Sequence, residues 1–231
     1  MLGKEDEQFL KTYNADKYEH PSVTVDMLIF TVEDNKLKLM LIKRKNPPYK
    51  DHWAIPGGFV NIDESVKTAA ERELQEETHM SAFLEEFGVF GEVNRDPRTR
   101  VISIGYLALT PNWQFCKMYA GDDAKEVEIF EVTYNNKLQF NKSIELAFDH
   151  DYIIRTGIEK LREKLQYTDI AFKLLGEEFT LFDLQKVYEA ILGYPLSKSN
   201  FRRSIRSKFK LVDTGKVSKK YQRPAKIYRR G

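Results

Sequence analysis

Three glutamates stand within five residues of one another in the segment GGFVNIDESVKTAAERELQEETHM, which covers residues 57–80. Residues 64–78 contain neither Pro nor Gly, so we expect this part of the segment to form a helix. At 100° per residue, Glu73, Glu76 and Glu77 occupy about 100° of one helix face. Small apolar residues lie on that same face one to two turns earlier. The three acids therefore continue the apolar stripe of the helix instead of its solvated side.

The position of the acids on the apolar stripe suggests that they bind a cation. Three like charges on a partly buried face repel one another, and burying them unpaired is costly. Hard divalent cations such as Mg²⁺ and Mn²⁺ prefer carboxylate oxygens, and Mg²⁺ commonly connects a protein to the phosphates of a substrate. The helix alone thus predicts a metal–phosphate site. The alternative is a solvated helix face whose glutamates serve only helix propensity.

The residues around these acids follow a longer pattern of fixed spacing. Gly58 is followed by five residues, Glu64, seven residues and then the run RELQEETHM. This pattern resembles the Nudix box, which ends in Glu-Glu-x-Gly and an aliphatic residue, and His79 is the one defining position that departs from it. The resemblance implies an α/β/α sandwich with a mixed sheet. It also implies a loop–helix–loop that binds a divalent metal and a diphosphate linked to another moiety.

The resemblance assigns roles to individual residues. The ligands of Mg²⁺ or Mn²⁺ that it implies are Gly58, through its carbonyl, Glu73, Glu76 and Glu77. One of the last two glutamates helps to activate water, and Arg72 pairs with a box carboxylate and orients it. Many members take another acid from outside the box; Glu126 is our candidate, ahead of Asp122 and Asp123, although each could be a surface acid. The predicted catalytic residues are Arg72, Glu76, Glu77 and Glu126.

His79 stands where the family pattern has Gly. A glycine directly after a helix usually adopts a positive φ, which His tolerates better than most other residues. We expect a cost of about 1 kcal/mol from this strain, and not the loss of the site. A direct metal-ligand role for His79 is the less favoured alternative. Whether hydrolysis persists is the question that this residue raises.

Four arginines are candidates for binding the substrate. The segment EVNRDPRTRVISIGYLAL (92–109) places three of them around a Pro-bearing turn before an expected buried strand, and guanidinium groups suit phosphate geometry. The alternative is a solvated basic loop. The DPR turn, and the segment KRKNPPYKDHWAIPGGFV with a fourth arginine, resemble Nudix proteins that handle ADP-ribose-like ligands. The predicted substrate-binding residues are Arg44, Arg95, Arg98 and Arg100.

The net charge of +2 hides a division between two parts of the chain. Residues 198–231 hold thirteen Lys and Arg against one acid, a net charge of +12, whereas the remaining 197 residues hold 24 bases and 34 acids, a net charge of −10. Such a division suggests two functions. The single cysteine, Cys116, and the absence of a signal peptide or a membrane-length apolar run favour a cytoplasmic protein that does not contact a membrane.

Periodicity and turn residues give a coarse map of the chain. We expect a hairpin at 23–32 and 37–45, a helix at 64–78, strands at 101–109 and 126–132, and a helix at 143–165, or two helices that meet near Gly157. The predicted domains are a loose N-terminal arm (1–20), a Nudix domain (21–165) and a winged helix domain (166–231).

The basic C-terminal part is typical of a DNA-binding domain. A helix at 180–192 precedes a basic helix that Ser199 could cap, in which Phe201, Ile205 and Phe209 share one side, and a basic hairpin follows. This order resembles a winged helix-turn-helix, which lays its second helix in the major groove of duplex DNA. The alternative is a solvated basic face with an unstructured tail. The predicted DNA-binding residues are Ser199, Arg202, Arg203, Arg206, Lys210, Lys219, Lys220 and Arg223.

A Nudix domain followed by a winged helix resembles the NrtR-type regulators, which sense ADP-ribose and control genes of NAD metabolism, while relatives sense sugars. The resemblance implies a protein that hydrolyses ADP-ribose or another nucleoside diphosphate derivative and also regulates transcription. One alternative is a regulator whose Nudix domain binds without cleaving; another is an RNA-processing Nudix enzyme with a basic tail. We expect a homodimer, because winged helix readers commonly bind paired half-sites.

Overall fold

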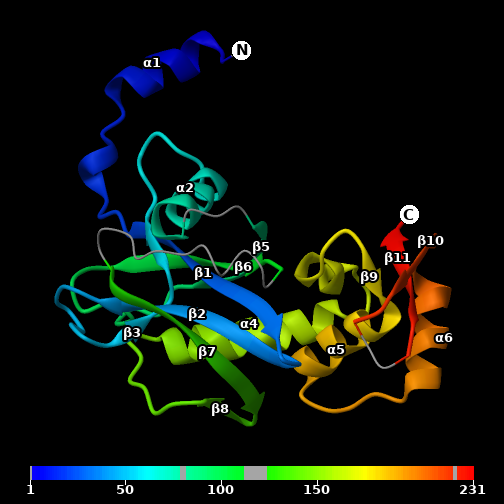
Figure 1. The fold of residues 1–231 in the computed structure, drawn as a ribbon. Helices are drawn as coiled ribbons and strands as arrows, with labels where there is room; N and C mark the ends of the chain where they lie inside the picture. Colours follow the sequence, from blue (N-terminus) through cyan, green and yellow to red (C-terminus); the bar gives the residue numbers. More distant parts are fainter. Residues whose placement is uncertain (1, 79–81, 112–123, 221–222) are drawn as a thin grey trace.

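The computed structural model describes residues 2–78, 82–111, 124–220 and 223–231. Within these residues, eight strands form one sheet (Figure 1). Its main path runs through β5 (Phe83–Phe90), β6 (Val101–Leu109), β1 (Ser22–Glu33), β2 (Lys36–Arg44), β7 (Ala124–Asn135) and β8 (Lys137–Phe140), with β3 (Trp53–Ala54) beside β2 and β4 (Gly57–Phe59) beside β1. The sheet is mixed, because β1 and β6 run parallel while β1 and β2 form the expected antiparallel hairpin.

Helices cover both faces of this sheet. The side chains of β1 alternate, so that Met27 and Ile29 pack with Leu74 of α2 (Val66–Thr78) while Leu28 and Phe30 join the cluster on the other face, which includes α4 (His150–Lys164). A strand that is covered on both faces reads as a continuous apolar run, as MLIF does here. The predicted α/β/α sandwich with a mixed sheet is confirmed.

The C-terminal part is a winged helix, as predicted. It contains η2 (Ile170–Leu174), α5 (Leu181–Leu192), α6 (Lys198–Lys208) and a three-stranded sheet in the order β10 (Leu211–Ser218), β11 (Ala225–Arg230) and β9 (Phe179–Thr180). α5 starts with a capping box, in which Thr180 and Asp183 satisfy each other's backbone N–H groups, and it ends at Gly193, whose φ is +82°.

One hydrophobic cluster runs through both parts of the chain. It joins Leu28 of the sheet, Ile158 of α4, Leu184 of α5 and Phe201 of α6. In Figure 1, α5 lies beside the end of the sheet and close to α4. The predicted domain boundary near residue 165 therefore falls at the end of α4 but not at a gap in the core, and it stays a prediction.

The expected start of one helix was wrong, whereas the expectation of a single helix that continues through Gly157 is confirmed. The helix expected from residue 143 begins only at His150, because the preceding segment pairs with β3: the backbone N–H of Ala147 donates to the Trp53 carbonyl at 2.8 Å. Gly157 does not interrupt α4. A Cβ at Gly157 would lie 2.0 Å from Leu28 Cδ1, so glycine allows the helix to approach the sheet.

The N-terminal arm is helical instead of loose. α1 (Lys4–Thr12) projects away from the sheet and is followed by the short helix η1 (Ala15–Lys17) (Figure 1). Acids in the first turn and Lys11 in the last turn complement the helix dipole, and no residue of α1 is buried. Among the described residues, no helix combines the length and the apolar character needed to cross a membrane.

Candidate functional site

A cavity of about 490 Å³ lies where the box helix α2 meets β1 and β4. It brings together residues that are far apart in the sequence. Those predicted from sequence are Gly58, Arg72, Glu73, Glu76, Glu77, Arg44, Arg95 and Arg98, and the cavity wall also includes Asp26, Phe59, Phe148 and His150. The box acids and three of the four candidate substrate arginines thus share one cavity.

Gly58 is required by a close approach to the box helix. It lies in β4, opposite Val25 of β1, and its backbone faces Glu73. A Cβ at this position would lie 2.1 Å from Glu73 Oε1, a distance that real atoms do not tolerate. Glycine at 58 therefore leaves room for the Glu73 carboxylate directly beside the strand.

Arg72 is the centre of the acidic end of the cavity. Its Nε and Nη2 donate to both oxygens of Glu64, at 3.1 and 2.7 Å, and Nη2 also donates to the carbonyl of Phe59 at 3.0 Å. Its Nη1 donates to Glu73 Oε1 at 2.7 Å and to Glu76 Oε2 at 3.1 Å. One guanidinium thus fixes three carboxylates relative to β4, which is the geometry expected of a positioning residue.

The two carboxyl groups that accept the shortest hydrogen bonds from Arg72 have pKa values that are shifted in opposite directions. The hydrogen bonds from Arg72 lower the pKa of Glu64 from 4.5 to about 2, with help from the N–H of Asn61. Burial raises the pKa of Glu73 above its ordinary value, and this effect outweighs the stabilising hydrogen bond from Arg72. A further positive charge near Glu73 would therefore favour its ionised form.

The donor set at this end fits a hard cation in its chemistry. Gly58, Glu73, Glu76 and Glu77 offer only oxygen atoms and line the same cavity. Within the described residues, however, no three acidic, histidine or cysteine side chains form a ready metal centre. Two of the acids instead share Nη1 of Arg72, which supplies the positive charge they need. The metal-ligand roles stay predictions.

Arg95 was expected to bind phosphate from a loop, but its guanidinium is buried in an ion-pair network. It donates to Asp149 Oδ1 at 2.7 Å and Oδ2 at 3.0 Å, and to Asp26 Oδ2 at 3.3 Å. Ser103 donates its hydroxyl to the same Asp26 oxygen. His150 lies beside this network, and burial lowers the pKa of its imidazole, whose Nδ1 accepts the Ile55 N–H at 2.9 Å. Arg95 thus lines the cavity with its charge already paired, and its role in binding substrate stays a prediction.

The other end of the cavity combines guanidinium groups with aromatic rings. Arg98 donates to both oxygens of Asp96, at 3.0 and 2.7 Å, and its Cζ lies 5.5 Å from the ring centroid of Phe59 and 5.7 Å from that of Phe148. Arg44 Cζ lies 4.9 Å from the Phe148 ring. Phe148 itself has a φ of +52°, a region that non-glycine residues rarely adopt. These groups suit a planar base or a sugar phosphate.

Two candidates do not reach the cavity. Arg100 is exposed and donates to the carbonyl of Glu92 at 3.1 Å. Glu126 lies in strand β7, where a strand was expected; its carboxylate is half exposed and contacts Lys43 Nζ at 3.4 Å. The sequence places these residues near the site but does not give the direction of their side chains. The predictions for His79, Asp122 and Asp123 fall outside the described residues, as does Cys116.

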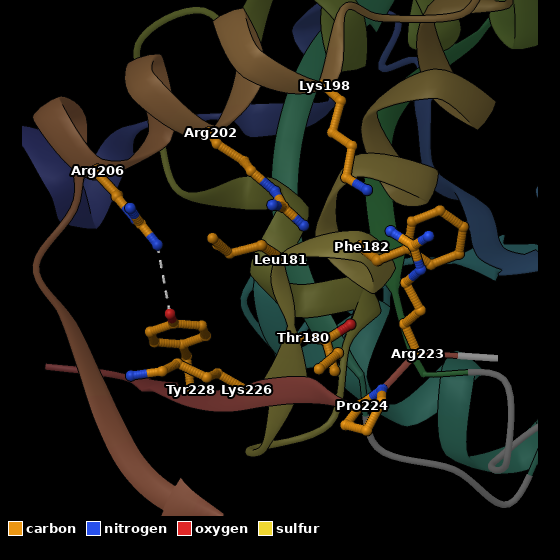
Figure 2. Close-up of a pocket in the computed structure, with 11 residues that line it drawn as sticks. Thr180, Leu181, Phe182, Lys198, Arg202, Arg206, Arg223, Pro224, Lys226 and Tyr228 are labelled. Atoms are coloured by element: carbon orange, nitrogen blue, oxygen red, sulfur yellow. Dashed lines mark hydrogen bonds between the residues drawn. The ribbon is translucent and has the colours of Figure 1, made fainter. Parts of the chain in front are cut away.

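A second cavity, of about 600 Å³, lies in the winged helix between α6, β11 and the start of α5 (Figure 2). It is lined by three predicted DNA-binding residues, Arg202, Arg206 and Arg223. Lys198 and Lys226 also line this cavity, although they were not among the residues predicted from the sequence to bind DNA. The spacing of Lys198, Arg202 and Arg206, four residues apart on one helix, could have revealed this row.

The remaining predicted DNA-binding residues lie outside this groove. Ser199 is in the first turn of α6 and does not cap it, because Ser197 holds the N-cap position. Arg203 is exposed and donates to Asn200 Oδ1 at 3.2 Å, and Lys220 Nζ lies 3.7 Å from Asp183 Oδ1. Both Lys210 and Lys219 are exposed.

The chain folds into a mixed sheet with helices on both faces, in which the box acids of α2 lie beside the glycine-containing strand β4, and a winged helix follows in the sequence. This combination defines a Nudix domain joined to a DNA-binding domain. The chain belongs to the NUDIX family: residues 21–145 match the NUDIX domain, and residues 171–230 match the NrtR DNA-binding winged helix domain.

Known relatives match both parts. The ADPR responsive transcriptional repressor NtrR of Acinetobacter baylyi is 34% identical over 227 residues, 97% of this chain and 88% of the relative. The ADP-ribose pyrophosphatase of Methanocaldococcus jannaschii is 42% identical over 147 residues, 63% of this chain and 77% of the relative. The crystal structure of Shewanella oneidensis NrtR complexed with a 27mer DNA has a TM-score of 0.75 and 30% identity, and covers 90% of this chain and 93% of that one.

Proposed function

We propose that this protein is a transcription regulator that binds ADP-ribose, or a related nucleoside diphosphate derivative, in its Nudix cavity and duplex DNA through its winged helix. The observation that carries the ligand class is the division of the cavity. Carboxylates and Arg72 occupy one end, while Arg44, Arg98 and Phe148 occupy the other. A diphosphate that links a base-bearing group to a second sugar offers complementary chemistry to both ends.

The names of the relatives support this proposal. One is described as an ADPR responsive repressor and another as an ADP-ribose pyrophosphatase. The match to a DNA-binding winged helix domain and the cationic groove beside α6 support the DNA-binding part. We further propose that the protein acts as a homodimer in the cytoplasm, since paired half-sites suit a two-fold reader.

We also propose that the cavity hydrolyses its ligand. Gly58, Glu73, Glu76 and Glu77 would hold Mg²⁺ or Mn²⁺, which supplies Lewis acidity and lowers the pKa of bound water. Arg72 keeps Glu73 and Glu76 in place, and Glu76 or Glu77 accepts the proton of the attacking water. The oxygen of that water bonds to one phosphorus atom as the phosphorus–oxygen bond of the bridge breaks. ADP-ribose would yield AMP and ribose phosphate.

The test is incubation of the full chain with ADP-ribose and Mg²⁺, followed by chromatography of the products. We expect AMP and ribose phosphate, and the double variant Glu76→Gln with Glu77→Gln should lose turnover. Calorimetry with ADP-ribose measures binding independently. Binding without turnover would leave a sensor that regulates transcription only, which is the alternative function. No binding to ADP-ribose would exclude it as the ligand.

The DNA-binding part is tested separately with a mixed-sequence duplex. Binding should weaken steeply as the salt concentration rises, because phosphate contacts release counterions. A preference for single-stranded RNA over the duplex would support the RNA-processing alternative instead.

A further inference from the structure

We propose that Asp26 and His150 form a subsite that holds a hydroxyl group of the ligand's nucleoside ribose, the sugar between the base and the diphosphate. Asp26 Oδ1 would accept the proton of the hydroxyl group, and the imidazole Nε2–H of His150 would donate to the hydroxyl oxygen. This inference rests on the proposed binding of ADP-ribose or a related nucleoside diphosphate derivative, and it adds the residues that select the sugar of that ligand.

A hydrogen bond to the backbone fixes which nitrogen of His150 carries a proton. The Ile55 N–H donates to Nδ1 at 2.9 Å, so Nδ1 offers its lone pair and bears no hydrogen. The imidazole is therefore neutral, and its proton is on Nε2. Burial lowers the pKa of the ring and favours the same form. Among the residues that the structure describes, none accepts a hydrogen bond from this Nε2–H.

The two oxygens of Asp26 have different surroundings. Arg95 Nη2 and the Ser103 hydroxyl both donate to Oδ2. Oδ1 accepts no hydrogen bond within the described part of the chain, and it faces β4, because a Cβ added at Gly57 would lie 3.1 Å from it. The side chains of His150 and Asp26 expose only 6% and 10% of their surface, and both line the Nudix cavity. A ligand in this cavity can therefore satisfy a donor and an acceptor that the protein leaves open.

The distance between these two atoms suits a single hydroxyl group. His150 Nε2 lies 3.9 Å from Asp26 Oδ1, which is too far for a direct hydrogen bond. A hydroxyl oxygen about 2.8 Å from each atom fits between them, since a hydroxyl group can donate to a carboxylate while it accepts from an N–H. A phosphate oxygen would be repelled by the carboxylate, and an ammonium group could not accept from the N–H.

The pair lies between the two ends of the cavity. The ring of His150 has its centroid 5.4 Å from that of Phe148, which belongs to the aromatic end. Asp26 pairs in the sheet with Gly57, the neighbour of Gly58 at the acidic end. In a nucleoside diphosphate the ribose likewise separates the base from the phosphates. With the base against Phe148 and the diphosphate beside Gly58, a hydroxyl group of this ribose would reach the pair.

The first test compares three ligands by calorimetry with the full chain, without divalent metal so that no ligand is cleaved. They are ADP-ribose and its two analogues that lack the 2′- or the 3′-hydroxyl group of the nucleoside ribose. One analogue should bind about 10- to 100-fold more weakly than ADP-ribose, because hydrogen bonds that include a charged group are lost. Equal affinities for all three ligands would overturn the proposal and leave ADP-ribose binding intact. If wild type binds no ADP-ribose, with or without Mg²⁺, the proposed function fails and this inference with it.

The second test uses two substitutions of His150 that each preserve one side of the ring. Asn places an oxygen near the position of Nδ1, whereas Gln places an N–H near the position of Nε2. His150→Asn should keep the bond from the Ile55 N–H but reduce the ratio of the two affinities about fivefold, since one neutral hydrogen bond is lost. His150→Gln should keep the ratio and lower the Tm. His20→Asn, in the exposed N-terminal arm, is the control and should change neither value.

A purely structural role of His150 predicts a different result. His150→Asn would then weaken both ligands equally, and an unchanged affinity ratio would refute the subsite. If His150→Asn does not fold, nitrogen NMR of the wild-type imidazole decides. Nε2 of His150 should carry the proton, and its signal should shift more with ADP-ribose than with the weaker analogue. A charged ring, or a proton on Nδ1, would show that the proposal is wrong.

Discussion

Arg162 of α4 donates its Nε to the carbonyl of Ile191, near the end of α5, at 2.9 Å. Its Nη2 donates to the carbonyl of Tyr134 in β7 at 2.7 Å. One guanidinium group therefore links three elements: the sheet, α4, which begins at the ligand cavity, and α5, the first long helix of the winged domain. Burial lowers the pKa of Arg162, as expected for a charge held away from water among carbonyl groups.

Replacing Arg162 by Met should lower the free energy of unfolding by about 2–3 kcal/mol, because two charge-assisted hydrogen bonds are lost and two carbonyls remain partly buried. Urea denaturation measures this loss. Arg155→Met is the matched control on the same helix, since Arg155 pairs with Asp151 at the surface, and it should cost less than 1 kcal/mol. Equal effects of the two substitutions would contradict the role of Arg162 as a link.

Replacing Gly58 by Ala should displace the Glu73 carboxylate, because the new Cβ would lie 2.1 Å from its oxygen. A displacement of a catalytic group by about 1 Å can slow the reaction by on the order of 100-fold. We expect this loss in ADP-ribose turnover, with the far-ultraviolet circular dichroism spectrum unchanged. Gly176→Ala, where the nearest atom is 4.0 Å from the added Cβ, serves as the control. Full activity of the Gly58 variant would mean that Glu73 does not contribute from its observed position.

The ion pair of Arg72 with Glu64 predicts a dependence of stability on pH. The pKa of Glu64 is lowered in the folded protein, so its stabilising contribution is fully present above the ordinary value of 4.5 and fades as the pH falls toward about 2. Wild type should therefore exceed Glu64→Gln in Tm at pH 6, and the two should converge near pH 2. A constant difference over this range would show that the charge of Glu64 is not what stabilises the loop before α2.

Replacing Arg95 by Met should destabilise the protein by about 3–5 kcal/mol, because Asp26 and Asp149 would lose the charge that pairs with them inside the structure. Arg100→Met, in the same loop, is the control and should be nearly neutral, since Arg100 is exposed. Denaturant unfolding of both variants without ligand tests this. An Arg95→Met variant that keeps its stability and only loses ligand affinity would instead support the predicted phosphate-binding role.

The spacing of the box residues was enough to predict α2 and the acidic end of the cavity, because Gly58, Glu64 and Arg72 meet within one loop and helix. The hairpin and the basic helix were predictable for a similar reason, since their patterns are local. Arg95 shows where such reasoning ends: its partners lie 69 and 54 residues away, and nothing in the basic turn indicates them.

Local sequence patterns also gave the wrong result for two elements, β5 and the start of α4. β5 was not predicted, because Glu85 and Glu86 interrupt its apolar residues and a register shift follows between Glu86 and Gly88. We predicted the start of α4 too early, because the segment before His150 has the composition of a helix but pairs with β3 instead. In both cases tertiary contacts decided against propensity.

The hydrophobic cluster that joins Leu28 to Phe201 has a consequence for how long the regulator survives in a cell. With one core, the chain should unfold in a single step, so a compound held in the Nudix cavity at 100 times its Kd adds about 2.7 kcal/mol to the stability of the DNA reader as well. Unfolded chains are the ones that proteases remove. A higher concentration of ligand would therefore increase the number of folded regulator molecules, in addition to any effect of the ligand on their affinity for DNA.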